Sequence, residues 1–200
     1  HALRRRFGAG RPVFVAASTR DGEEALLLDA LARGALPPRT LVVIVPRHPQ
    51  RFAAVAALAA ARGLACVRRS ANTDVPADTA LFFGDSLGEL PAYYAAADVA
   101  FVGGSLVPLG GQNLIEAIAM GTPVLVGPHT FNFADAAEGA VAAGAALRVA
   151  DADGMLAQAA ARLADAPRRE AMRSRAEAFL AAHRGATGRT WAFVAARLAR

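Results

Sequence analysis

Residues 99–133 constrain the fold of this chain more than any other part of its sequence. Within them an apolar run, Val99 to Val102, ends in Gly103-Gly104, and a second glycine pair, Gly110-Gly111, precedes apolar residues at helical spacing. Another apolar run, Val124 to Gly127, follows. Short apolar runs that end in glycine are typical of parallel strands buried on both faces. The order of strand, glycine-rich loop, helix and strand predicts a nucleotide-binding β-α-β unit.

The glycine-rich loop predicts a phosphate site. Glycine lets backbone N–H groups approach a ligand closely, and the free N–H groups at the start of a helix favour an anion. Asn113 can cap this helix, which places the carboxylate of Glu116 on its first turn. A carboxylate only accepts hydrogen bonds and so suits ribose hydroxyls, but an Asn-x-x-Glu capping box explains the same pair. The spacing leaves both interpretations open.

The rest of the chain predicts an α/β fold with a parallel sheet. Further strands are predicted at Pro12 to Ala17, Leu41 to Val45, Cys66-Val67 and Ala80 to Phe83, with an edge strand at Ala145 to Val149. Helices are predicted at Pro49 to Arg62, Leu90 to Ala97, Ala134 to Ala143, Asp153 to Asp165, Pro167 to Ala182 and Arg189 to Arg200. On the last of these, an apolar stripe is expected to face the core: Trp191, Phe193, Val194 and Leu198.

Composition and charge exclude several classes of protein. With 54% hydrophobic residues, the 200 residues can bury one large core, and no apolar run approaches the roughly 18 to 20 residues that span a bilayer. We expect a soluble fragment, since the chain starts at His1 and has no signal peptide at its front. The single cysteine, Cys66, excludes disulfides and cysteine-based zinc sites.

The net charge of +5 favours anionic partners such as a nucleotide or a phospholipid surface. Nucleic acid is not expected, because the arginines are scattered apart from the run Arg4-Arg5-Arg6. All 22 basic residues are arginine, which excludes a Walker phosphate-binding loop with its lysine. A dinucleotide-dependent dehydrogenase is also disfavoured, because no Gly-x-Gly-x-x-Gly follows the first strand.

Two further loops follow predicted strands. In Pro46-Arg47-His48-Pro49 an arginine lies between two prolines at the end of a predicted strand, where ligands bind in α/β sheets. Arg47 is either a clamp on a phosphate or carboxylate, or an ordinary solvated arginine of the surface. In Ser18 to Glu24, Asp21 with Glu24 matches a capping box, and helix capping also explains Ser18 and Thr19.

The loop Gly84 to Gly88 reads Gly-Asp-Ser-Leu-Gly, which matches a nucleophile elbow and the signature of one esterase family. That family needs a late Asp-x-x-His, which this chain lacks, although Asp98 and His129 could be proposed as the acid and the base. A plain strand-to-helix loop also explains the motif.

Residues Gly103 to Glu116, with Gly127 to Phe133, resemble the 3-deoxy-D-manno-octulosonic acid (Kdo) transferases, which move Kdo from CMP-Kdo onto lipid A precursors. The resemblance spans nearly the whole chain. It implies the C-terminal, donor-binding half of a GT-B fold: one Rossmann-like domain over residues 1–200, with a sheet of about six strands and C-terminal helices from about residue 153. The N-terminal acceptor domain would lie outside this chain.

The resemblance also implies the nucleotide contacts. They are Pro46, Arg47, Leu87, Gly88, Glu89, Asn113, Leu114, Ile115 and Glu116, with Ser18, Gly111 and Gln112 as further candidates. Two positions depart from the family pattern. Leu87 stands where most members have Met, a swap of similar volume, and Gln112 stands where they usually have His. Glutamine cannot carry a charge, so any role of a charged side chain at that position is in doubt.

The general base of the family lies in the N-terminal domain, so the resemblance implies no catalytic residue here and no activity of the isolated domain. It implies no cofactor and no metal; Asp151-Ala152-Asp153 resembles a metal motif of another glycosyltransferase fold but is expected to cap the next helix. The expected partners are CMP-Kdo and, through the other domain, a lipid A precursor. The whole protein is expected at the cytoplasmic face of the bacterial inner membrane, where it could touch the membrane surface.

Two alternatives stay open. One is another GT-B glycosyltransferase domain that uses a UDP- or GDP-sugar, which would share the fold and the glycine-rich loop. The other is a nucleotide-binding module without catalytic function. Calorimetry with CMP, UMP and GDP separates the first alternative from a Kdo transferase.

Overall fold

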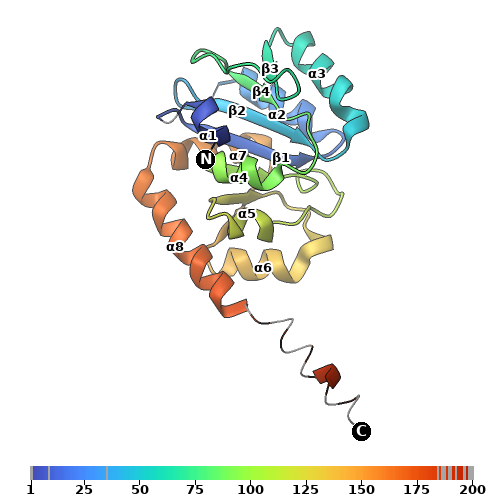
Figure 1. Cartoon of the computed structure of the whole chain (residues 1–200), viewed down its shortest axis with the longest axis vertical. Helices are drawn as coiled ribbons and strands as arrows, with labels where there is room; N and C mark the ends of the chain where they lie inside the picture. The colour runs from blue at the N-terminus through green and yellow to red at the C-terminus, as the bar shows by residue number, and fades with distance from the viewer. Residues whose placement is uncertain are drawn as a thin grey trace.

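The computed structural model describes residues 2–183 except 9 and 35, together with 185, 188, 191, 193–195 and 197. A parallel sheet of seven strands, in the order β3-β4-β2-β1-β5-β6-β7, forms its centre (Figure 1). The strands are β1 (Val13–Thr19), β2 (Leu41–Pro46), β3 (Cys66–Arg68), β4 (Leu81–Phe83), β5 (Val99–Val102), β6 (Val124–Val126) and β7 (Ala146–Arg148). The predicted parallel α/β fold is confirmed, with seven strands instead of about six.

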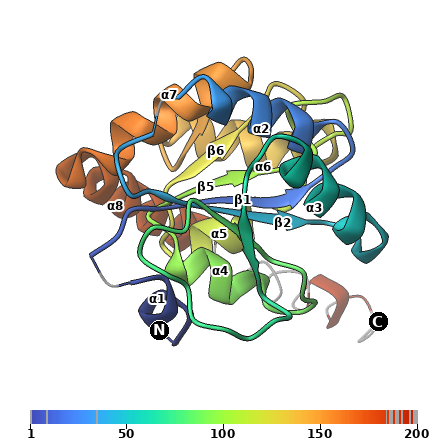
Figure 2. The same ribbon diagram turned by 90° about the horizontal axis from the view of Figure 1, so that it is seen from above.

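Helices cover both faces of the sheet. They are α1 (Ala2–Phe7), α2 (Glu23–Ala32), α3 (Phe52–Ala61), α4 (Leu90–Ala96), α5 (Ile115–Ala119), α6 (Ala134–Ala142), α7 (Ala152–Leu163) and α8 (Ala166–His183), with the 3-10 turns η1 (Pro49–Arg51) and η2 (Phe131–Phe133). Figure 2 shows α2, α3 and α7 on one side of the sheet and α1, α4 and α5 on the other. Buried side chains of α6 and α8 join the core on the second side.

The central strands are apolar throughout because both of their faces are buried. Along β1, Val13, Val15 and Ala17 pack into the core with α4 and α5, whereas Phe14 and Ala16 pack into the core with α2 and α7. Every residue of β1, β2 and β5 is buried. This double burial explains why the sequence shows continuous apolar runs instead of an alternating pattern.

The order of the strands reverses direction at β1. The chain moves outward on one side through β2 and β4, then returns to pair β5 with the other edge of β1. In open α/β sheets such a switch point leaves a crevice at the carboxyl ends of the two strands, where ligands bind. At this point the register of β1 against β2 shifts between Ala17 and Thr19, and Ser18 adopts a φ of 55°. The backbone is therefore strained beside the crevice.

Two local predictions are wrong. Gly22 is the N-cap of α2 and no side chain caps this helix, so Asp21 and Glu24 form no capping box. Farther on, Trp191, Phe193 and Val194 are exposed in the described structure and do not face a core; Leu198 lies outside the described residues. By contrast, Asp151 caps α7 as predicted, since its side chain accepts a hydrogen bond from the Gly154 N–H at 2.7 Å.

Within the described part of the chain, no helix is both long and apolar enough to cross a membrane.

Candidate nucleotide-binding site

The predicted site residues lie at the ends of strands, in the loops that follow them and at the start of α5. Strands β1, β2, β4 and β5 are parallel neighbours, so the loops that follow them emerge at the same edge. The loops also touch. The backbone N–H of Arg47, after β2, donates to the Thr19 carbonyl at the end of β1 (3.0 Å), and the Arg47 Nε donates to Oε1 of Gln112, after β5 (3.3 Å).

A buried glutamate that the sequence analysis did not single out organises the glycine-rich loop. Glu23, the first residue of α2, is 1% exposed. Its carboxylate accepts hydrogen bonds from four backbone N–H groups, one at 2.6 Å and three at 2.9 Å, which belong to Gly104, Arg20, Ser105 and Leu106. Burial raises the pKa of the Glu23 carboxyl, and these four hydrogen bonds oppose the rise. The first half of the loop is thus bound to the protein's own carboxylate and is not open to a phosphate.

The first glycine pair serves packing. A Cβ on Gly103 would lie 2.6 Å from the Ser18 carbonyl oxygen and 2.7 Å from the Thr19 Cα. Only glycine therefore lets the end of β5 approach the end of β1 this closely. Gly104 follows with a φ of +71°, and its carbonyl accepts a hydrogen bond from the Gly111 N–H at 2.6 Å, which closes the loop on itself.

The second half of the loop keeps free donors. In the described structure the backbone N–H groups of Gln112, Asn113 and Leu114 have no hydrogen-bond partner. Leu114 occupies the N-cap position of the five-residue helix α5 and makes no side-chain cap bond. The side chain of Asn113, one residue earlier, caps the helix instead, because its Oδ1 accepts from the Ile115 N–H, the first of α5 (3.0 Å). Its Nδ2 donates to the exposed Glu116 (3.1 Å). Consecutive unpaired N–H groups next to an arginine can bind an anion.

Ion pairs of Arg51 join the segments that follow β1 and β2. Glu24 is fully buried, accepts a hydrogen bond from the Thr19 hydroxyl at 2.9 Å and pairs with Arg51 of η1 at 3.0 Å. Arg51 also pairs with Asp21 at 2.6 Å. Ser18 and Thr19 are themselves buried, at 6% and 1% exposure. The structure thus uses Thr19 to fix the loop that presents Arg47, while Arg47 itself is exposed.

The loop after β4 is held at both ends by Arg68, the last residue of β3, and by residues that follow it. The nearly buried side chain of Asp85 accepts hydrogen bonds from the backbone N–H of Ser70 (2.8 Å), from its hydroxyl (2.6 Å) and from the Arg68 Nε (2.8 Å). Glu89 accepts two hydrogen bonds from Arg69, at 2.7 and 2.9 Å. Leu87, which lies between Asp85 and Glu89 in the chain, is 70% exposed. The predicted contacts at 87–89 therefore form a protruding segment held at its two ends.

These contacts change the acidity of both carboxyl groups. Burial acts to raise the pKa of Asp85, but the hydrogen bonds from Ser70 and Arg68 outweigh it, and the pKa of Asp85 lies below its ordinary value. The hydrogen bonds from Arg69 are the main reason that the pKa of Glu89 is also lowered.

A pH dependence of stability follows. A carboxyl group with a lowered pKa in the folded state contributes stability that is present above its ordinary pKa near about 4 and is lost as the pH falls through the lowered value. We expect the free energy of unfolding, measured with urea, to decrease between about pH 5 and about pH 2. The double variant R68Q/S70A should lose less over the same interval, because it weakens the bonds to Asp85. Equal losses would show that Asp85 does not carry the dependence.

The described residues do not form a hydrolase triad. The Ser86 hydroxyl lies 3.0 Å from the Tyr93 hydroxyl, and burial raises the pKa of Tyr93 to about 12, so this partner is no base near neutral pH. Asp98 precedes β5 at the opposite edge of the sheet, where it pairs with Arg4 at 3.0 Å. His129 lies beside the glycine-rich loop and donates its backbone N–H to the Ser105 carbonyl. The Gly-Asp-Ser-Leu-Gly motif is a strand-to-helix loop here.

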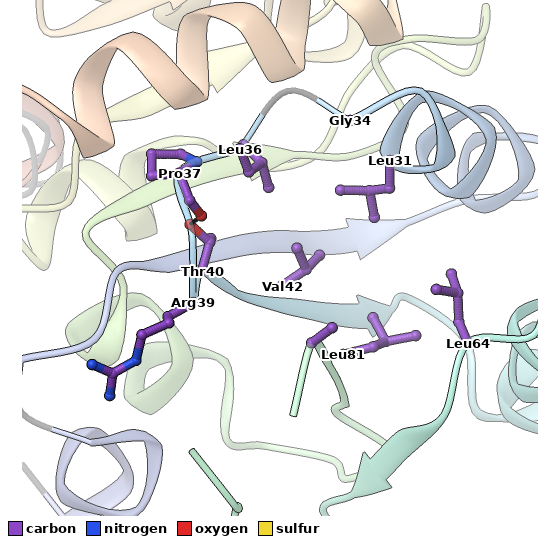
Figure 3. A pocket seen from close by; sticks show the side chains of 10 residues that line it. Leu31, Gly34, Leu36, Pro37, Arg39, Thr40, Val42, Leu64 and Leu81 are labelled. Atoms are coloured by element: carbon purple, nitrogen blue, oxygen red, sulfur yellow. Dashed lines mark hydrogen bonds between the residues drawn. The ribbon is translucent and has the colours of Figure 1, made fainter. Parts of the chain in front are cut away.

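An apolar pocket of about 340 Å³ lies away from this site (Figure 3). Its lining includes Thr40 just before β2 and Leu81, the first residue of β4, which places it toward the amino ends of the strands. Figure 3 shows Leu31, Leu36 and Leu64 around it. It shares no residue with the predicted nucleotide site. Within the described ranges, no group of three or more His, Cys, Asp or Glu side chains could hold a metal ion.

Comparisons with known proteins agree with the resemblance seen in the sequence. No protein-family model matches the chain. It is 57% identical over 186 residues to the 3-deoxy-D-manno-octulosonic acid transferase of Bordetella pertussis, covering 90% of this chain and 44% of that protein. It is 44% identical over 133 residues to the transferase of the same name from Haemophilus influenzae, covering 66% and 31%. The chain thus spans less than half the length of these relatives.

Among solved structures, the fold matches the C-terminal CMP-Kdo binding domain of WaaA from Acinetobacter baumannii. The TM-score is 0.83 at 33% identity, and the match covers 90% of this chain and 98% of that one. The chain therefore matches a whole solved domain in its sequence as well as in its fold. The chain belongs to the 3-deoxy-D-manno-octulosonic acid transferase family, and it corresponds to the C-terminal domain of that family.

Proposed function

We propose that this chain is the donor-binding domain of a Kdo transferase. It binds CMP-Kdo, and the whole protein, with an N-terminal acceptor domain, transfers Kdo to a lipid A precursor in lipopolysaccharide synthesis at the cytoplasmic face of the bacterial inner membrane. The observation that carries the proposal is the match to the Acinetobacter baumannii domain, which binds CMP-Kdo and of which the chain covers 98%.

The chemistry of the crevice supports an anionic ligand of this kind. CMP-Kdo carries a phosphodiester and a carboxylate. The unpaired N–H groups of Gln112, Asn113 and Leu114 can donate to phosphate oxygens, and the guanidinium of Arg47 lies against Gln112 at the same loop. The proposal assigns neutralisation of the donor's charge to these groups and requires no metal.

The remaining predicted contacts divide between the sugar and the base. Glu116 is exposed on the first turn of α5 and has acceptor capacity beyond its bond from Asn113, so it suits the ribose hydroxyls. The segment Leu87, Gly88 and Glu89 stands at the start of α4, which packs against α5. It is assigned to the cytosine. No residue of this chain is assigned the role of general base, which the proposal leaves to the N-terminal domain.

Calorimetry on this chain tests the proposal. We expect tighter binding of CMP than of UMP or GDP, without Kdo transfer by the chain alone. R47A should weaken CMP binding by about tenfold or more, because a charge-assisted contact to phosphate is lost. R39A is the control, since this exposed arginine precedes β2 at the opposite edge.

Two results would contradict the proposal. Equal binding of all three nucleotides, or a preference for UMP or GDP, would favour a different GT-B glycosyltransferase domain. Kdo transfer by the isolated chain would show that the general base is not in a separate domain. If adding the N-terminal half of a relative restores transfer, a module without catalytic function is excluded.

A further inference from the structure

We propose that Arg69 is a positioning residue that sets the base selectivity of the site by holding Glu89, and with it residues 87–89, in one conformation. The inference rests on the proposed function, because it concerns how the same crevice distinguishes cytosine from uracil. Arg69 follows β3, a short strand at the edge of the sheet, and belongs to no motif of the sequence.

The contact between Arg69 and Glu89 is bidentate. The Arg69 Nε donates to one carboxylate oxygen at 2.9 Å, and its Nη2 donates to the other at 2.7 Å. The backbone N–H of Arg69 in turn donates to the Phe83 carbonyl at the end of β4 (2.9 Å). Two parallel hydrogen bonds fix the plane of the carboxylate as well as its distance, which a single contact cannot do. The side chains of Arg69 and Glu89 are 25% and 34% exposed, so a ligand can reach the pair.

The segment between the two clamps has little packing of its own. Leu87 is 70% exposed. Gly88 adopts a φ of +74°, and a Cβ built on it would find no atom within 4 Å. Its conformation therefore depends on the contact between the Ser86 and Tyr93 hydroxyls (3.0 Å) and on its two ends. These ends are Asp85, held by Ser70 and Arg68, and Glu89, held by Arg69. Loss of Arg69 releases one end of the segment.

The carboxylate of Glu89, held in place by Arg69, can distinguish cytosine from uracil. Cytosine presents an amino donor at N4, whereas uracil presents a carbonyl acceptor at the corresponding position. A carboxylate accepts from the first and repels the second, and each oxygen retains acceptor capacity after one bond to Arg69. Glu89 is an ionised acceptor at neutral pH, and the hydrogen bonds from Arg69 lower its pKa further. Fixed orientation is what makes this contact selective, since a mobile carboxylate can turn away from uracil.

Titration of the chain with CMP and with UMP tests the inference. In R69Q we expect CMP to bind about tenfold more weakly or worse, with little change for UMP, so that the CMP-to-UMP ratio of affinities falls toward one. R69K keeps the charge but loses the bidentate geometry, and its ratio should lie between those of R69Q and the wild type. The control is R62Q, which removes the contact of Arg62 with Asp29 of α2 (2.7 Å) and its bond to the Leu58 carbonyl of α3 (3.1 Å). The ratio of R62Q should equal that of the wild type.

The CMP-to-UMP ratio of affinities distinguishes a positioning role of Arg69 from a merely structural one. An ion pair that only stabilised the fold would lower the affinities for both nucleotides together, and an unchanged ratio in R69Q or R69K would overturn the inference. If R69Q does not fold, R69K decides, because it retains a partner for Glu89. A wild-type chain without a preference for CMP would overturn the proposed function and this inference with it, whereas a wild-type preference that survives in both variants would overturn the inference alone.

Discussion

E23A is expected to destabilise the domain by about 4 kcal/mol or more and to abolish CMP binding. Four backbone N–H groups donate to this carboxylate, which is 1% exposed, and each donor left unsatisfied in a buried position costs about 1–3 kcal/mol. Three of them belong to the glycine-rich loop, so the loop should lose its conformation before the rest of the sheet does. Urea unfolding and CMP calorimetry measure the two effects.

Two variants bracket the expected result. E23Q keeps the shape and one acceptor oxygen, so it should retain part of the stability while its amide NH₂ opposes the donors on its side. E170A removes an exposed carboxylate of α8 and should change the unfolding free energy little. If E23A were as stable as E170A, water would be satisfying the loop N–H groups and Glu23 would not organise the loop.

G127A should be nearly as damaging, for a steric reason. A Cβ on Gly127, just after β6, would lie 2.2 Å from the Ser105 carbonyl oxygen and 2.6 Å from the Leu106 nitrogen. Backbone atoms cannot move aside as the end of a side chain can, so the loop after β5 must shift and lose the bond from the Gly127 N–H to the Ser105 hydroxyl (2.8 Å). Overpacking of this kind costs about 3 kcal/mol. Thermal unfolding and CMP binding should both report it.

The matched control for this variant is G10A, because no atom lies within 4 Å of a Cβ built on Gly10. A near-neutral G10A with a strongly destabilised G127A isolates the contact with Ser105. A G127A protein that melts with the wild type would mean that the two loops are not packed as described.

The strands could be predicted because the sheet is buried on both faces. Continuous apolar runs such as Leu41 to Val45 and Val99 to Val102 are typical of such strands, and the edge strand β7 was predicted from its short apolar segment. The seven-strand order could not be predicted from these runs. It depends on which crossovers pack helices on each face, and the periodicity of the sequence does not encode that choice.

The residues that build the site were only partly predictable. Arg47 and the glycine pairs stand out by their type and position, but Glu23 and Glu24 look like ordinary acidic residues of a helical first turn. Their burial comes from the loop after β5, which folds over them from far along the chain. The available signal was a pair of adjacent acidic residues four positions after the end of a buried strand. Arg69 was hidden among scattered arginines, because its partner Glu89 is distant in the sequence.

The pairing at the centre of the sheet also determines how the molecule must assemble. Phe14 of β1 lies beside Val99 of β5, and the adjoining contact from Val13 to Asp98 spans 85 positions. During synthesis, β2 can pair with one edge of β1 early, but the other edge of β1 remains unpaired until β5 leaves the ribosome. Contacts of such long range slow folding, and an open apolar strand invites association with other chains. Nascent chains of this domain should accordingly depend on chaperones until residue 102 has emerged.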